Sequence, residues 1–174
     1  KIIKGCDVPW GMVKLTDGDF LISERSGTLY RVKPGQERQA VANLPEVNAR
    51  GQGGLLDLVL HPEYSKNGWI YISYASADGD GDGDNTNIIR AKLNGNALTD
   101  VETIYKPARN YKRRFHYGSR MAFDKTGMLY FSIGDRGERD VFPQDTDQDG
   151  GKIYRVHADG KIPTDNPFAD SKVP

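Results

Sequence analysis

The sequence predicts an all-β protein built from repeated sheet units, and three observations support this prediction. Helical periodicity is nearly absent along the 174 residues. Short runs of β-branched, aromatic and aliphatic residues recur instead, and Gly, Asp, Asn and Pro separate them, which is typical of strands joined by turns. The composition agrees, because 20 Gly and 9 Tyr suit a turn-rich sheet protein.

The runs fall into three units that share one order: strand, tight turn, strand, variable loop, strand. Each unit has Ser at the end of its second run and Arg in its third run. A glycine lies in the turn before each second run, where a tight turn needs its backbone freedom. The runs lie at residues 12–15, 20–23 and 29–32 in the first unit, at 56–60, 70–73 and 88–91 in the second, and at 121–123, 129–132 and 153–156 in the third.

A repeat of roughly 50–65 residues suits the four-stranded blade of a β-propeller. We therefore predict a partial β-propeller over residues 1–174, with about three blades at approximately 8–50, 51–110 and 111–174. A β-sandwich with chance internal similarity is the alternative. Because propellers typically have 4–8 blades, three blades do not close a ring and would expose apolar faces. We expect the remaining blades, or a second subunit, to complete it.

Charge and composition exclude several classes of function. The 24 basic residues balance 24 acidic ones, whereas nucleic acids and anionic membrane surfaces attract a cationic surplus. No apolar run approaches the roughly 18 residues of a membrane span. Cys6 is the only cysteine, so the chain has neither an internal disulfide nor a cysteine cluster for a metal. Residues 1–5 lack the apolar region of a signal peptide, so the chain is either cytosolic or already trimmed.

Two polar side chains open blades at equivalent places. Gln52 lies in the glycine-rich segment 50–57 at the start of the second unit, and His116 lies at the start of the third. A propeller would bring both to its axis on one face, and His is the natural general base near neutral pH. The structural alternatives are a simple turn around Gln52 and a packing role for His116.

Asp135 ends the strand that follows the His116 strand, so a hairpin could place its carboxylate beside the imidazole. A carboxylate there would orient the ring and stabilise its cation. The alternative is a turn Asp that caps its own backbone.

Charged runs give weaker signals. The acidic runs 78–84 and 145–150 resemble the start of a calcium loop, but neither has the Glu that an EF-hand needs at its twelfth position. We expect the first run to be a mobile, solvated insertion, with weak calcium binding as the alternative. The basic run 112–114 is expected to be a solvated loop, or else a contact for an anionic ligand or a redox partner.

Seven motifs occur in order between Pro9 and Phe168. They are PWGM at 9–12, SERSG at 23–27, GQGGLLD at 51–57, HPEY at 61–64, HYGSR at 116–120, GDRG at 134–137 and GKIPTDNPF at 160–168. Together they resemble the soluble quinoprotein sugar dehydrogenases of the glucose/sorbosone dehydrogenase family, which includes aldose sugar dehydrogenases.

The resemblance implies a six-bladed propeller, of which this chain is the first half, with pyrroloquinoline quinone (PQQ) and calcium as cofactors and export to the periplasm or beyond. It implies oxidation of an aldose sugar to a lactone, with His116 as the base for the anomeric hydroxyl and hydride transfer to the quinone. Asp135 matches the supporting acid, Gln52 a residue of the sugar and quinone pocket, and Arg120 a positioning residue. A cytochrome or similar protein would accept the electrons.

The sequence departs from the family where the Arg-Asn-Pro motif and the Gly-Pro calcium segment would follow, since the chain stops six residues after Phe168. Most cofactor contacts and the quinone-bound calcium would come from that half, so the metal ligands are unknown. Two other functions stay open. One is a propeller that only binds a partner, and the other is a calcium-dependent lactone hydrolase with Asp57 and Asp135 as its candidate carboxylates.

Overall fold

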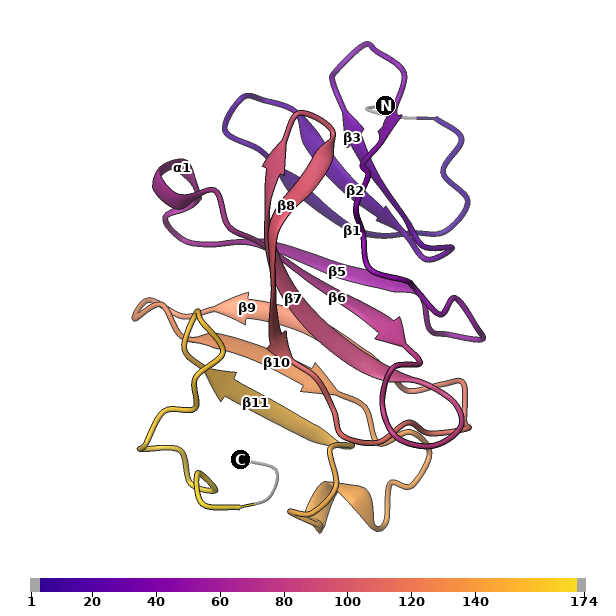
Figure 1. Ribbon diagram of the computed structural model, residues 1–174, viewed down its shortest axis with the longest axis vertical. Helices are drawn as coiled ribbons and strands as arrows, with labels where there is room; N and C mark the ends of the chain where they lie inside the picture. Colours follow the sequence, from indigo (N-terminus) through magenta and orange to yellow (C-terminus); the bar gives the residue numbers. More distant parts are fainter. Residues whose placement is uncertain (1–3, 172–174) are drawn as a thin grey trace.

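The computed structural model describes residues 4–171, which form three antiparallel sheets that follow one another along the chain (Figure 1). Strands pair in chain order within every sheet, so each sheet is a meander. Two short stretches lie outside the described residues, namely 1–3 and 172–174. The first is part of the segment 1–5 that was compared with a signal peptide, and the second ends the predicted third blade.

Strands make up nearly all of the regular structure, which confirms the all-β prediction. The described part of the third unit contributes three strands, not four. No helix in residues 4–171 is both long and apolar enough to cross a membrane. The elements are β1 (Pro9–Lys14), β2 (Phe20–Glu24), β3 (Thr28–Val32) and β4 (Gln39–Ala40) in the first sheet; β5 (Leu55–Leu60), β6 (Ile70–Ser76), β7 (Asn85–Asn94) and β8 (Ala97–Tyr105) in the second; β9 (Gly118–Phe123), β10 (Leu129–Ile133) and β11 (Lys152–Val156) in the third; and, between strands, the short helix α1 (Tyr64–Asn67) and the 3-10 turn η1 (Phe142–Gln144).

A register shift recurs in the first strand of every sheet, in β1, β5 and β9. A β-bulge of this kind leaves a backbone group without a partner in the ladder. In the first sheet the Ser23 hydroxyl accepts a hydrogen bond from the Gly11 N–H, and in the second the Ser73 hydroxyl accepts one from the Asp57 N–H, each at 2.8 Å. This role explains the Ser at this place in the first two units.

Apolar side chains join neighbouring sheets face to face. Leu29 and Ile72 belong to a buried cluster shared by the first and second sheets, and Tyr71 and Phe131 belong to one shared by the second and third. Full burial of a side chain of this size contributes roughly 1.5–3 kcal/mol. The three sheets therefore stack as consecutive layers, as Figure 1 shows from top to bottom.

Loops of the second and third sheets meet on one side of this stack, at the right in Figure 1. Backbone hydrogen bonds join them, because the Gln52 N–H donates to the Arg114 carbonyl and the Tyr111 N–H donates to the Asp84 carbonyl. We call this region the loop edge. It consists of residues 48–54, 77–84, 108–117 and 134–151.

Candidate active site

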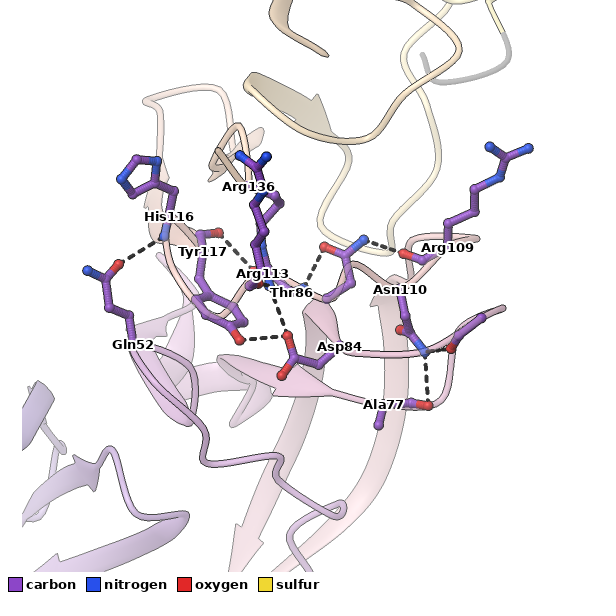
Figure 2. Close-up of polar contacts among 12 residues, drawn as sticks. Gln52, Ala77, Asp84, Thr86, Arg109, Asn110, Arg113, His116, Tyr117 and Arg136 are labelled. Atoms are coloured by element: carbon purple, nitrogen blue, oxygen red, sulfur yellow. Dashed lines mark hydrogen bonds and ion pairs between the residues drawn. The ribbon is translucent and has the colours of Figure 1, made fainter. Parts of the chain in front are cut away.

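His116 lies on the loop edge, two residues before β9 begins. Its backbone has a φ of 56°, in the left-handed region that residues other than glycine seldom adopt. The His116 N–H donates to the Gln52 side-chain oxygen at 2.9 Å (Figure 2). Its carbonyl packs so closely on Gly134 that a Cβ there would lie only 1.9 Å from the oxygen. The backbone of this residue is therefore held from two sides.

The imidazole of His116 contacts Asp135, with 2.8 Å between Nδ1 and Oδ1. The same carboxylate oxygen accepts the Gly137 N–H at 2.8 Å. The Gly137 N–H, followed by His116, lowers the pKa of Asp135, so the carboxylate is ionised at neutral pH. An ionised carboxylate can only accept, so Nδ1 carries the proton and Nε2 is left as the basic nitrogen.

Both arrangements considered for Asp135 from the sequence are present together in the structure. Asp135 lies beside the imidazole, as the hairpin argument predicted, and it also caps the turn at Gly137, which was the alternative. The His116 side chain is 54% exposed and that of Asp135 is 21% exposed. A ligand can therefore reach the ring from the solvent side.

Gln52 lies beside His116 and belongs to the loop before β5. Its backbone N–H donates to the Arg114 carbonyl and its side-chain oxygen accepts from His116. The side-chain NH2 group has no hydrogen-bond partner within residues 4–171 and so remains available to a ligand.

Arg120 lies elsewhere. The bulge in β9 directs it away from the His116–Asp135 pair, and its guanidinium contacts Asp57 of β5, with 2.7 Å between Nη1 and Oδ1. The other oxygen of Asp57 accepts the Met121 N–H at 2.9 Å. Arg120 therefore links the second and third sheets, and no contact joins it to His116.

Two buried charges behind His116 were missed in the sequence. Arg136 is fully buried and forms an ion pair with Asp84, whose side chain is 2% exposed. The expectation of a solvated insertion is therefore wrong for Asp84, the last acidic residue of the run 78–84. No sequence signal marked the pair, because Arg136 and Asp84 lie 52 residues apart in the chain.

The basic run 112–114 is largely neutralised. Lys112 pairs with Asp82 at 3.2 Å and Arg113 with Glu138 at 2.9 Å. By contrast, Arg114 and Arg50 form no ion pair within residues 4–171. Both line a hollow of about 410 Å³ on the loop edge. Asp82 and Asp84 also line the hollow, but Lys112 and Arg136 neutralise them, so the two arginines remain as donors for an anionic group.

The second acidic run is also partly buried. Asp149 is 7% exposed and accepts a hydrogen bond from the Tyr105 hydroxyl. Burial raises the pKa of Asp149. In the described part of the chain, no three His, Cys, Asp or Glu side chains are grouped so that they could hold a metal ion.

Known proteins resemble this chain in sequence and in structure. Aldose sugar dehydrogenase YliI of Escherichia coli is 34% identical over 93% of the chain and 44% of its own length. Quinoprotein glucose dehydrogenase B of Acinetobacter calcoaceticus is 29% identical over 95% of the chain and 40% of its own length. The PQQ-bound aldose sugar dehydrogenase of Streptomyces coelicolor has 31% identity and a TM-score of 0.81, over 99% of the chain and 51% of that structure.

The chain therefore spans about half the length of the relatives that it matches. The structural likeness confirms the prediction of a propeller-type fold. The sequence of residues 6–173 matches the Glucose / Sorbosone dehydrogenase family, and the chain belongs to that family.

Proposed function

We propose that the full-length protein oxidises an aldose to its lactone with PQQ as the oxidant, and that this chain supplies the general base. The observation that carries the proposal is the His116–Asp135 contact of 2.8 Å. Relatives named aldose sugar dehydrogenase and glucose dehydrogenase support the substrate class. The PQQ-bound relative supports the cofactor.

The donors at the loop edge fit PQQ, a quinone that carries three carboxylates. Arg50 and Arg114 offer two guanidinium groups without an ion-pair partner in residues 4–171, in a hollow of about 410 Å³. Gln52 adds a free amide NH2 group beside His116. We infer that these three side chains would hold polar groups of the cofactor. When bound, PQQ supplies the two-electron oxidation of the anomeric carbon.

Calcium does not fit the described residues in the same way. Calcium prefers several oxygen ligands around one ion, and within residues 4–171 no such group of carboxylates is assembled. The proton removal that we propose for this chain therefore uses protein side chains only.

Proton removal follows from the geometry of the pair. Because Asp135 accepts the Nδ1 proton, the Nε2 lone pair of His116 can take the proton of the anomeric hydroxyl. The transfer produces an imidazolium, which the ionised Asp135 stabilises from the opposite edge of the ring. The Gln52 amide, fixed by the His116 N–H, can orient the sugar or the cofactor.

Further blades would complete the ring in this proposal, with blade boundaries near residues 50 and 110. Ile153 of β11 is 78% exposed and Phe168 is 58% exposed, and apolar side chains so exposed favour burial under another element. The proposal also includes a cytochrome-like electron acceptor and a periplasmic or secreted location, both implied by the family resemblance.

The test is dye reduction by the full-length protein with PQQ, calcium and a panel of aldoses. We expect activity that His116→Ala abolishes and that His157→Ala, a change at an exposed histidine outside the loop edge, leaves intact. Full-length protein that binds no PQQ and reduces no dye with any aldose would overturn the proposal. A non-catalytic binding propeller would then be the better reading.

A further inference from the structure

We propose that Arg136 is a positioning residue for this reaction, whose buried ion pair with Asp84 holds His116 and Asp135 in the geometry that proton removal requires. The inference rests on the proposed function, because positioning has meaning only where His116 acts as a base. Arg136 is fully buried, so it acts through its neighbours and not on the substrate.

The ion pair is enclosed and interlocked with an aromatic ring. The Arg136 Nη2 lies 2.9 Å from the Asp84 Oδ1, and the Tyr117 hydroxyl donates to the same oxygen at 2.6 Å (Figure 2). The guanidinium carbon lies 3.7 Å from the centre of the Tyr117 ring, within range of a cation–π contact. Burial, followed by the Asp84 contact, raises the pKa of Tyr117 to about 12, so the hydroxyl remains a donor.

The backbone connects this network to both members of the catalytic pair. Arg136 follows Asp135 directly in the chain, so a fixed Arg136 side chain limits where Asp135 can lie. The Arg136 Nη2 also donates to the carbonyl of Arg113, on the segment that leads to His116. Tyr117, which directly follows His116, is the ring beneath the guanidinium. One buried side chain therefore contacts the chain on both sides of His116.

Further hydrogen bonds fix the residue after the base. The Tyr117 carbonyl accepts the Thr86 hydroxyl at 2.8 Å and the Gly134 N–H at 3.1 Å. Thr86 lies at the start of β7, next to the loop that ends in Asp84. The second sheet thus holds the segment around His116 through Thr86 and Asp84 in addition to Gln52.

The backbone conformations show why such support is needed. His116 has a φ of 56°, and Arg136, which follows Asp135, has a φ of 52°. Both residues are therefore left-handed. Left-handed residues other than glycine are strained and persist only where their surroundings over-determine them. The contacts of Arg136 and Tyr117 provide that constraint next to the reacting ring.

Packing alone does not account for Arg136. Its Nε and Nη1 groups are buried without a hydrogen-bond partner in residues 4–171. Unpaired buried N–H groups are unfavourable, and apolar side chains commonly replace a buried ion pair without loss of stability. The presence of a buried cation at this position, despite that penalty, indicates a role at the adjacent His116–Asp135 pair.

The experiment compares variants of the full-length protein with PQQ bound. In Arg136→Gln we expect kcat to fall roughly 100-fold, the scale of a misplacement of about 1 Å, with KM changed less than about threefold. Arg136→Lys, which keeps the charge, should recover part of kcat. The control is Arg31→Gln, which breaks ion pairs with Asp17 and Asp19 in the first sheet. Its kcat should stay near that of the wild type.

A second readout does not depend on turnover. In protein with 15N-labelled histidine, the His116 Nδ1 proton is identified by its loss in His116→Ala. We expect this proton to be visible in the wild type and in Arg31→Gln, and to be lost to solvent exchange in Arg136→Gln. If the wild type reduces no dye, the proposed function fails while this signal still decides whether Arg136 positions the pair.

Two outcomes would overturn the inference. The first is an Arg136→Gln protein with wild-type kcat and an unchanged His116 Nδ1 proton. The second is an Arg136→Gln protein whose activity falls only in proportion to the amount of folded protein, while the folded fraction keeps the His116 Nδ1 signal. If Arg136→Gln does not fold, Asp84→Asn decides, because it removes the charge with which Arg136 pairs. An unchanged kcat and Nδ1 proton there would equally refute the role.

Discussion

Replacement of Asp135 by Asn should slow the proposed reaction while leaving the fold intact, because the change removes only the charge that faces His116. Two unit charges about 4 Å apart attract by about 1 kcal/mol in water and by about 4 kcal/mol at an effective dielectric constant near 20. The side chains are 54% and 21% exposed, so solvent screens part of the attraction. We therefore expect a loss of about 1–3 kcal/mol of transition-state stabilisation, or roughly 5- to 150-fold in kcat.

The assay is the initial rate of dye reduction by the full-length protein at saturating aldose and PQQ. Asp165→Asn serves as the matched control, since it removes a carboxylate that pairs with Arg155 outside the loop edge. The melting temperature of each variant shows how much protein is folded. If Asp135→Asn keeps the wild-type kcat while His116→Ala is inactive, Asp135 only caps the turn at Gly137, and the supporting role assigned to it is wrong.

Other changes to the full-length protein test the packing and the buried charges. Gly134→Ala should lower both activity and melting temperature, because the new Cβ would lie 1.9 Å from the His116 carbonyl oxygen unless the hairpin moves. Phe131→Ala should cost about 3–5 kcal/mol in urea unfolding, since the ring is 1% exposed in the core between two sheets. For Asp149, burial raises the folded pKa above an unfolded value of about 3.9, so its contribution to stability falls as pH rises between the two values. Asp149→Asn should therefore gain stability relative to the wild type as pH increases through that interval, and an unchanged difference in unfolding free energy would contradict the assignment.

The sequence sufficed for the fold and for the proximity of His116 to Asp135 because both follow from strand order. Consecutive strands pair as antiparallel neighbours, so the start of one strand lies beside the end of the next. For this reason His116, before β9, and Asp135, after β10, could be expected together. The repeated Ser was visible as well, although its partner in the first two sheets, the N–H at the bulge, was not.

Bulges and long-range ion pairs set the limit of the sequence prediction. Arg120 was given a positioning role because it shares a motif with His116. The contact that it makes, across the sheets to Asp57, depends on the extra residue in β9, which the sequence did not show. Asp84 was taken for part of a solvated acidic run, because local composition does not show that a remote Arg136 is buried against it. Such contacts depend on how two sheets approach each other, which no local pattern specifies.

The arrangement of the site makes its geometry depend on the packing of two sheets. Gln52 and Asp84 belong to loops of the second sheet, whereas His116, Asp135 and Arg136 belong to the third, and every contact between these groups crosses that interface. A core change between these two sheets, even far from the loop edge, should therefore displace His116 relative to Gln52 before it unfolds the protein. Variants in the core between the second and third sheets should lose activity at temperatures below their melting transitions. Core changes between the first and second sheets should affect stability alone.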